Sequence, residues 1–120
     1  MRTYNGEDMG RHVLLNLYEC EDVEGLRDLA TFSVFADGML ANAGAEVVNT
    51  LDHQFDPVGE AGFTYLALLT TSHFSIHTWP EHRSAAVDIF TCGSVSTIQI
   101  VDNLISYFDA AHHSVKDVLR

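Results

Sequence analysis

A serine, a histidine and a cysteine with reactive side chains occupy a short part of the chain. Ser72 and His77 belong to one run of alternating polar and apolar residues, and Cys92 ends the next such run. A serine hydroxyl is a nucleophile when a base activates it, a histidine titrates near neutral pH, and a thiol can donate a proton. These residues could supply the nucleophile, the base and the acid of one catalytic site.

The pairing of residues 73–79 with residues 84–91 decides whether these side chains meet. Pro80 cannot donate a hydrogen bond within a sheet, so the first strand should end at Trp79 and residues 80–83 should form a turn. The opposite pairs that follow are Trp79 with Ser84, His77 with Ala86, Ser75 with Asp88, His73 with Phe90 and Thr71 with Cys92.

Side chains of a strand alternate between its two faces, so this hairpin has an apolar and a reactive face. The apolar face, expected under helices, carries Phe74, Ile76, Ala85, Val87 and Ile89. The reactive face carries His73, Ser75, His77, Trp79, Asp88, Phe90 and Cys92. Ser72 falls on the apolar face by parity, so the strand should be bulged or turned there for Ser72 to join the group.

Two other interpretations of this face stay open. It could be a half-exposed strand surface with incidental histidines and an inert cysteine. It could also bind a metal, because histidines are frequent, at positions 53, 73, 77, 82, 112 and 113. The Cys and His quartet of a structural zinc site is missing, however, and His112 and His113 are expected at a helix end, where their charge suits the helix dipole. No metal is therefore expected.

Composition predicts one folded domain over residues 1–120, since 47% of the 120 residues are hydrophobic and 19% are charged. The formal charge of −11 disfavours nucleic acid and favours a small cationic substrate. No stretch is as apolar as a membrane span, and we expect no leader of the secretory type because residues 1–10 have no apolar run. We expect a cytoplasmic protein in which Cys20 and Cys92 are free thiols.

Hydrophobic periodicity predicts an α+β fold, a two-layer α/β sandwich with a mostly antiparallel sheet and two helices on one face. The expected order is β-α-β-β-β-α-(β). Strands are predicted at 12–18, 47–55, 64–70, 73–79 and 84–91, with a short last strand at 115–119. One helix covers 25–43 and ends at Gly44; the other follows Ser94 or Ser96 and has the apolar stripe Ile98, Val101, Leu104, Ile105 and Phe108. The face left uncovered, with Trp79 and Phe90, predicts a homodimer.

Two segments resemble the prokaryotic S-adenosylmethionine decarboxylases: Ser72 to Glu81, SHFSIHTWPE, and Asp88 to Gly93, DIFTCG. The similarity covers residues 9–93 well, the second helix only by type. It is supported by Gly10-Arg11-His12, Tyr18-Glu19-Cys20, Gly44-Ala45, His53-Gln54-Phe55, Pro57 and Gly59.

The resemblance implies a proenzyme that cleaves itself between Thr71 and Ser72, giving chains 1–71 and 72–120. The Ser72 hydroxyl would attack the Thr71 carbonyl, and His77 would be the base that eliminates the ester, leaving a covalent pyruvoyl group as cofactor. The pyruvoyl ketone would form a Schiff base with the substrate and accept its electrons, while Cys92 would protonate the carbanion. The resemblance also implies a homodimer.

S-adenosylmethionine is the substrate that the resemblance implies, decarboxylated to the aminopropyl donor of spermidine, a polyamine. Phe55 would stack on adenine and Glu81 would accept the ribose hydroxyls. Thr71 stands where the family usually has Glu. A serine assists processing in the family, and either Thr64 or Ala61 stands at its place here; of the two, only Thr64 has a hydroxyl. A decarboxylase of arginine or ornithine, or an inactive partner subunit, stays open as an alternative.

Overall fold

The computed structural model describes residues 9–57 and 59–120. Within them the chain forms six strands, two α-helices and one 3₁₀ turn. In chain order these are β1 (Arg11–Cys20), α1 (Leu29–Asn42), β2 (Val47–Gln54), β3 (Phe63–Leu69), β4 (Ser72–Trp79), the 3₁₀ turn Pro80–His82, β5 (Ser84–Thr91), α2 (Thr97–Phe108) and β6 (Ala110–Leu119). The predicted order of elements is confirmed.

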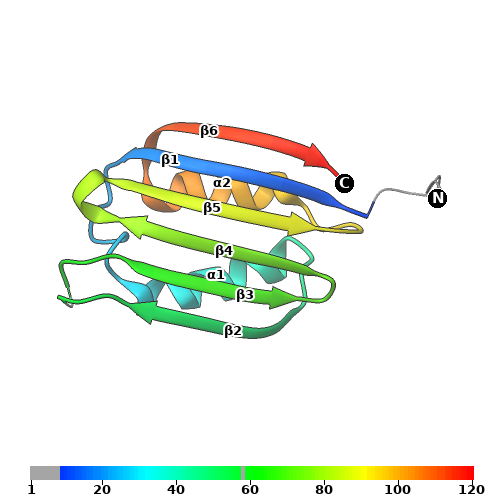
Figure 1. Ribbon diagram of the computed structural model, residues 1–120, viewed down its shortest axis with the longest axis horizontal. Helices are drawn as coiled ribbons and strands as arrows, with labels where there is room; N and C mark the ends of the chain where they lie inside the picture. The colour runs from blue at the N-terminus through cyan, green and yellow to red at the C-terminus, as the bar shows by residue number, and fades with distance from the viewer. Residues whose placement is uncertain (1–8, 58) are drawn as a thin grey trace, which may run out of the picture.

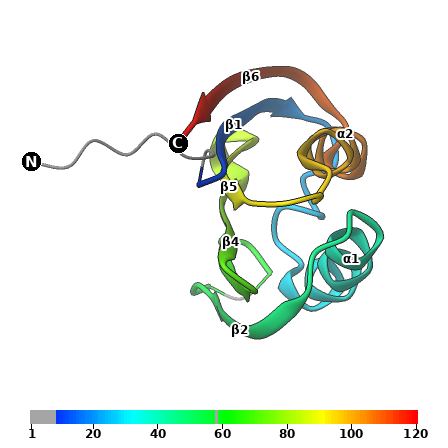
Figure 2. The same cartoon turned by 90° about the vertical axis from the view of Figure 1, so that its right-hand side faces the viewer.

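The strands form one antiparallel sheet in the order β2-β3-β4-β5-β1-β6 (Figure 1). Seen along the sheet, α1 and α2 both lie on the same side of it (Figure 2). This is the predicted two-layer α/β sandwich. Neither described helix is long and apolar enough to cross a membrane.

The core lies between the helices and the apolar sheet face predicted for β4 and β5, whose residues are all buried. Phe32 of α1 is central to it, with its ring 5.2 Å from that of Phe63 on β3 and 5.7 Å from that of Phe108 on α2. One prediction for α2 is wrong: Ile98 is 69% exposed, whereas Ile100 is fully buried. The helix begins at Thr97 after its N-cap Ser96, which turns Ile100, Leu104 and Phe108 inward at four-residue steps.

Helix α1 begins at Leu29 and not near Gly25, because Asp28 caps it. The Asp28 carboxylate accepts a hydrogen bond from the Thr31 amide at 3.0 Å, and this bond holds the pKa of Asp28 below its usual value. The helix closes as predicted at Gly44, whose φ of 93° is left-handed. The Gly44 amide donates to the Ala41 carbonyl and the Ala45 amide to the Leu40 carbonyl.

The last strand is longer than predicted, because β6 spans ten residues and pairs with β1 along its length. Its side chains are almost all exposed, so it lacks the hydrophobic alternation that marks a half-buried strand. His112 and His113 lie in this strand rather than at a helix end, contrary to the prediction. His112 Nε2 lies 2.9 Å from the Glu19 carboxylate of β1.

Candidate active site

A two-residue turn, Thr70-Thr71, joins β3 to β4 and carries the predicted cleavage point. Leu69 pairs with Ser72 across it, and the Thr70 amide donates to the Glu46 carbonyl at 3.1 Å. Thr71 has a φ of 58°, a left-handed conformation that a β-branched residue rarely adopts. The register of β4 with β3 is continuous up to Ser72, so of the two expected possibilities the chain turns before Ser72 and forms no bulge there.

Cys92 lies beside this turn, where the hairpin register put it. Its Sγ is 2.7 Å from the Thr71 hydroxyl, 3.5 Å from the Ser72 hydroxyl and 3.8 Å from the Thr71 carbonyl oxygen. The hydrogen bond with Ser72 and, to a smaller extent, the hydrogen bond with Thr71 lower the pKa of the Cys92 thiol. Ser72 is only 7% exposed, whereas Cys92 is partly open to a cavity of about 270 Å³ that Gly10, Arg11 and Gly93 also line.

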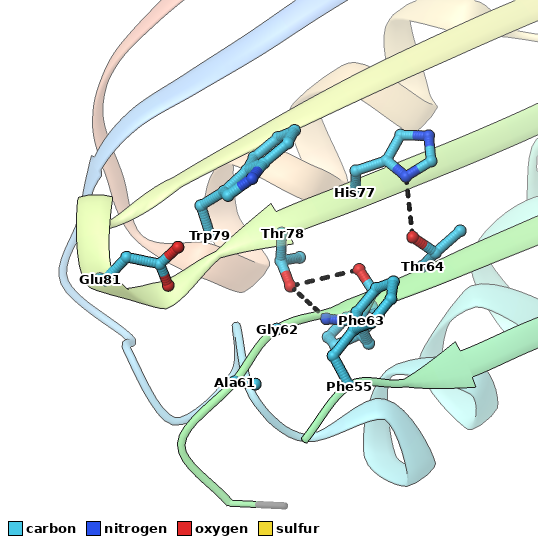
Figure 3. Close-up of a pocket in the computed structure, with 9 residues that line it drawn as sticks. All are labelled: Phe55, Ala61, Gly62, Phe63, Thr64, His77, Thr78, Trp79 and Glu81. Atoms are coloured by element: carbon cyan, nitrogen blue, oxygen red, sulfur yellow. Dashed lines mark hydrogen bonds between the residues drawn. The ribbon is translucent and has the colours of Figure 1, made fainter. Parts of the chain in front are cut away.

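A second cavity, of about 340 Å³, lies at the opposite end of β4 (Figure 3). The predicted base His77 and the predicted processing residue Thr64 both line it, and His77 Nδ1 is 2.8 Å from the Thr64 hydroxyl. Both predicted substrate-binding residues, Phe55 and Glu81, line the same cavity, together with Trp79. Aromatic rings, a carboxylate and an imidazole thus share one open pocket.

Thr78 and Gly62 build the inner wall of this second cavity. The Thr78 hydroxyl donates to the Leu26 carbonyl at 2.7 Å and accepts from the Phe63 amide at 2.9 Å. A Cβ at Gly62 would lie 2.1 Å from the Thr78 carbonyl oxygen, so this close approach of two backbones requires glycine. Our sequence reasoning missed Thr78, although a polar residue at an apolar-face position was a usable signal.

Gln54, the last residue of β2, was also missed. Its Nε2 donates to the carbonyls of Ala61 and Gly62 at 3.2 and 3.0 Å, and its Oε1 accepts from the Leu29 amide at 3.4 Å. The side chain therefore fastens the pocket loop to the first residue of α1. A glutamine at a strand end has no pattern that reveals such a role.

The structure does not bring Ser72 and His77 together within one chain. Five positions separate them on an extended strand, which is about 16 Å at roughly 3.3 Å per residue. Ser72 is on the buried face and His77 on the exposed one. The predicted residues form two groups at opposite ends of the sheet, Thr71, Ser72 and Cys92 at one end and Phe55, Thr64, His77 and Glu81 at the other.

Within residues 9–57 and 59–120, no group of three or more His, Cys, Asp or Glu side chains is arranged to hold a metal ion. Cys20 is a fully buried free thiol at the end of β1, and burial raises its pKa to about 11. Cys92 is therefore the thiol with the lowered pKa among the two cysteines.

Comparisons with known proteins agree on one family. The model of the S-adenosylmethionine decarboxylase family matches residues 11–120. The S-adenosylmethionine decarboxylase proenzyme of Prochlorococcus marinus (strain MIT 9313) is 40% identical over 113 residues, 93% of this chain and 87% of the relative. The S-adenosylmethionine decarboxylase proenzyme 2 of Halalkalibacterium halodurans is 40% identical over 101 residues, 83% of this chain and 76% of the relative.

One solved structure supports the same assignment, and a second shares the fold. The crystal structure of the adenosylmethionine decarboxylase from Aquifex aeolicus VF5 superposes with a TM-score of 0.83 at 28% identity, over 96% of this chain and 92% of that one. The Trypanosoma brucei AdoMetDC-delta26 monomer shares the fold, with a TM-score of 0.62 at 16% identity, over 88% of this chain and 44% of that one. The family model, the sequence identities and the shared fold thus lead to one conclusion: the chain belongs to the S-adenosylmethionine decarboxylase family.

Proposed function

We propose that this chain is a self-processing, pyruvoyl-dependent decarboxylase of S-adenosylmethionine, whose product supplies the aminopropyl group of spermidine. The observation that carries the proposal is the contact of Cys92 with both residues of the Thr71–Ser72 bond. We place the enzyme in the cytoplasm, because its proton donor must stay a free thiol and Cys92 is a free cysteine.

Self-cleavage starts from the turn at Thr71. A left-handed conformation costs an L-residue about 1–2 kcal/mol, and this strain lies next to the bond to be broken. The Ser72 Oγ attacks the Thr71 carbonyl carbon, and the Ser72 nitrogen leaves as a free amine, giving an ester. A base then removes the Ser72 α-proton and the Thr71 carboxylate departs. Water converts the remaining dehydroalanine to a pyruvoyl group and ammonia.

The residues around Ser72 fit such a group, since its source hydroxyl is nearly buried and contacts a thiol of lowered pKa. When present, the pyruvoyl group supplies a ketone that binds the substrate amine and accepts the electrons released with carbon dioxide. Cys92 gives its Sγ proton to the substrate carbon and recovers one from solvent. The cavity beside Cys92 supports this role because it gives the thiol access to solvent.

The base for the elimination comes from a second copy of the chain. His77 is suited to the task because the Thr64 hydroxyl holds its Nδ1 and leaves Nε2 available. The separation of Ser72 and His77 prevents them from reacting within one protomer. A two-fold axis between two facing sheets, running across the strands, would set the Ser72 end of one β4 over the His77 end of the other. The active enzyme is then a homodimer with two shared sites.

The open face of the sheet supports this homodimer. Among the described residues no helix covers it (Figure 2), and it carries large apolar side chains that are exposed in one chain. These are Leu14, Tyr18, Leu51, Leu66, Leu68, Trp79 and Val118. A patch of this kind usually marks an interface, and facing sheets pack at about 10 Å, close enough for both ends of β4 to meet their counterparts.

The pocket around His77 suits an adenosyl group. The Phe55 ring offers a surface for stacking on adenine, and the Glu81 carboxylate can accept both ribose hydroxyls (Figure 3). The sulfonium charge is favoured by aromatic faces, by about 0.5–2 kcal/mol, and by the net charge of −11.

Intact-mass spectrometry combined with a carbon dioxide release assay tests the proposal. The purified protein should contain chains 1–71 and 72–120, the latter beginning with a pyruvoyl group, and Ser72→Ala should stay at 13.3 kDa. The cleaved protein should release carbon dioxide from S-adenosylmethionine and not from arginine or ornithine. A wild-type protein that stays uncleaved after long incubation would overturn the enzyme assignment and favour an inactive partner subunit.

A further inference from the structure

The side chain of Thr71 has a position that the cleavage reaction itself does not require. The reaction uses the Thr71 carbonyl, which any residue would supply. The Thr71 hydroxyl, however, lies 2.7 Å from the Cys92 Sγ and also 2.7 Å from the Thr70 carbonyl oxygen, to which it donates. One hydroxyl therefore joins the proton donor to the backbone of the turn.

We propose that in the uncleaved chain the Thr71 hydroxyl is a positioning group for Cys92, which orients the thiol beside the Thr71–Ser72 bond and favours its thiolate form. The inference concerns the chain before self-cleavage, because cleavage breaks the turn and leaves a carboxylate on Thr71. It goes beyond the proposed function by assigning a role to the side chain before the cleaved bond.

A hydroxyl can serve both protonation states of Cys92 because it has one proton and two lone pairs. With the thiol protonated, Cys92 donates to the Thr71 oxygen and Thr71 donates to Thr70. After proton transfer the hydroxyl rotates and donates to the negatively charged sulfur. The hydrogen bond to the charged sulfur is the stronger of the two, which favours the thiolate. The lowered pKa of Cys92, to which Thr71 contributes, agrees with this direction.

The turn keeps Thr71 in place for this purpose. The Thr70 amide is bonded to the Glu46 carbonyl on one side, and Leu69 pairs with Ser72 on the other. Threonine and valine have the same branched shape and the same preference against a left-handed φ. Replacing one with the other removes the hydroxyl while leaving the strain of the turn unchanged.

The charged and titratable groups on the neighbouring elements stay constant in such a comparison. Arg11 lines the same cavity and forms an ion pair of 2.9 Å with Asp117, from β1 and β6. His73 lies on β4 opposite Phe90, two positions before Cys92 in the neighbouring strand, and Glu46 precedes β2. None of them is altered when residue 71 alone is changed, so differences between variants report on that side chain.

The test measures the reactivity of Cys92 in protein that cannot cleave. In a Ser72→Ala background, the rate of alkylation by iodoacetamide is followed against pH by mass spectrometry of the peptide that contains Cys92. Cys20 is an internal control, because it is fully buried and its pKa is about 11. We expect Thr71→Val to move the alkylation midpoint upward by about half to one pH unit. Thr71→Ser should restore it, and Thr71→Glu should raise it further through like-charge repulsion.

The inference is overturned if the Thr71→Val variant has the same midpoint of Cys92 alkylation as the protein that keeps Thr71. It is also overturned if the midpoint of Thr71→Ser equals that of Thr71→Val. Either result would leave Thr71 with a structural role alone. The assay requires neither cleavage nor substrate, so its outcome is independent of the proposed function. Conversely, a wild-type chain that fails to cleave would refute the proposed function without changing the alkylation result.

Discussion

Thr64 and His77 face each other across the β3–β4 pair, with 2.8 Å between the Thr64 hydroxyl oxygen and His77 Nδ1. When Nδ1 carries the proton and donates it to the Thr64 hydroxyl, Nε2 of His77 is free to act as a base. Thr64 is therefore expected to assist self-cleavage by orienting His77.

Replacing Thr64 with valine should slow self-cleavage by about ten- to a hundredfold, because the imidazole loses its orienting partner. The fraction of cleaved chain over time, measured by denaturing electrophoresis, gives the rate. Thr64→Ser keeps the hydroxyl and should cleave at nearly the normal rate. Equal rates for the valine and serine variants would show that the hydroxyl has no part in processing.

The shared site predicts that two inactive variants restore each other. Ser72→Ala chains lack the nucleophile and His77→Ala chains lack the base, so each alone should fail to complete cleavage. When they are expressed together, a mixed dimer joins Ser72 of one chain to His77 of the other. The His77→Ala chain should then be cleaved, and its 72–120 fragment can be recognised by mass.

The control for this experiment is co-expression of His77→Ala with the double variant Ser72→Ala/His77→Ala, which supplies no His77. Cleavage should then be absent. If the first mixture forms dimers and still shows no cleavage, the two ends of the sheet do not form one site. Light scattering of the same samples reports whether the dimers are present.

Glu81→Gln should raise the KM for S-adenosylmethionine about tenfold or more while leaving self-cleavage unchanged, because a charged acceptor for the ribose hydroxyls is lost. Glu60→Gln is the matched control, since it removes the same charge from the nearby loop without altering a residue that lines the cavity. Similar effects of both changes would indicate a response to net charge rather than a contact with substrate.

Gly62→Ala should destabilise the protein by about 1–3 kcal/mol, because its Cβ would overlap the Thr78 carbonyl. Gly38 offers a contrast: it lies in α1 with open space around it, and Gly38→Ala should stabilise the protein by up to about 1 kcal/mol. Urea unfolding of both variants measures the two changes. A stable Gly62→Ala variant would mean that β3 and β4 can separate there without loss.

The central hairpin could be predicted residue by residue, because β4 and β5 bury one face and expose the other. That burial imposes a strict alternation of apolar and polar side chains on the two strands within residues 73–91. Pro80 marks the end of the first strand, where the chain turns back. The faces of Phe74 and His77, and the position of Cys92 beside Thr71, followed from this pattern alone. For strands that bury one face only, the local sequence was sufficient to predict which way each side chain points.

Features that depend on contacts between distant segments could not be predicted in the same way. Strand β6 is almost wholly exposed and is defined by its pairing with β1, so its own residues carry little periodicity. The choice of Ile100 over Ile98 depended on where Ser96 starts α2. The sequence by itself determined which residues could do chemistry and, within the β4–β5 hairpin, on which strand face each side chain lies. Only the tertiary structure decided that Thr64 meets His77 and that Ser72 does not, because strand register and the length of β4, rather than residue type, set those distances.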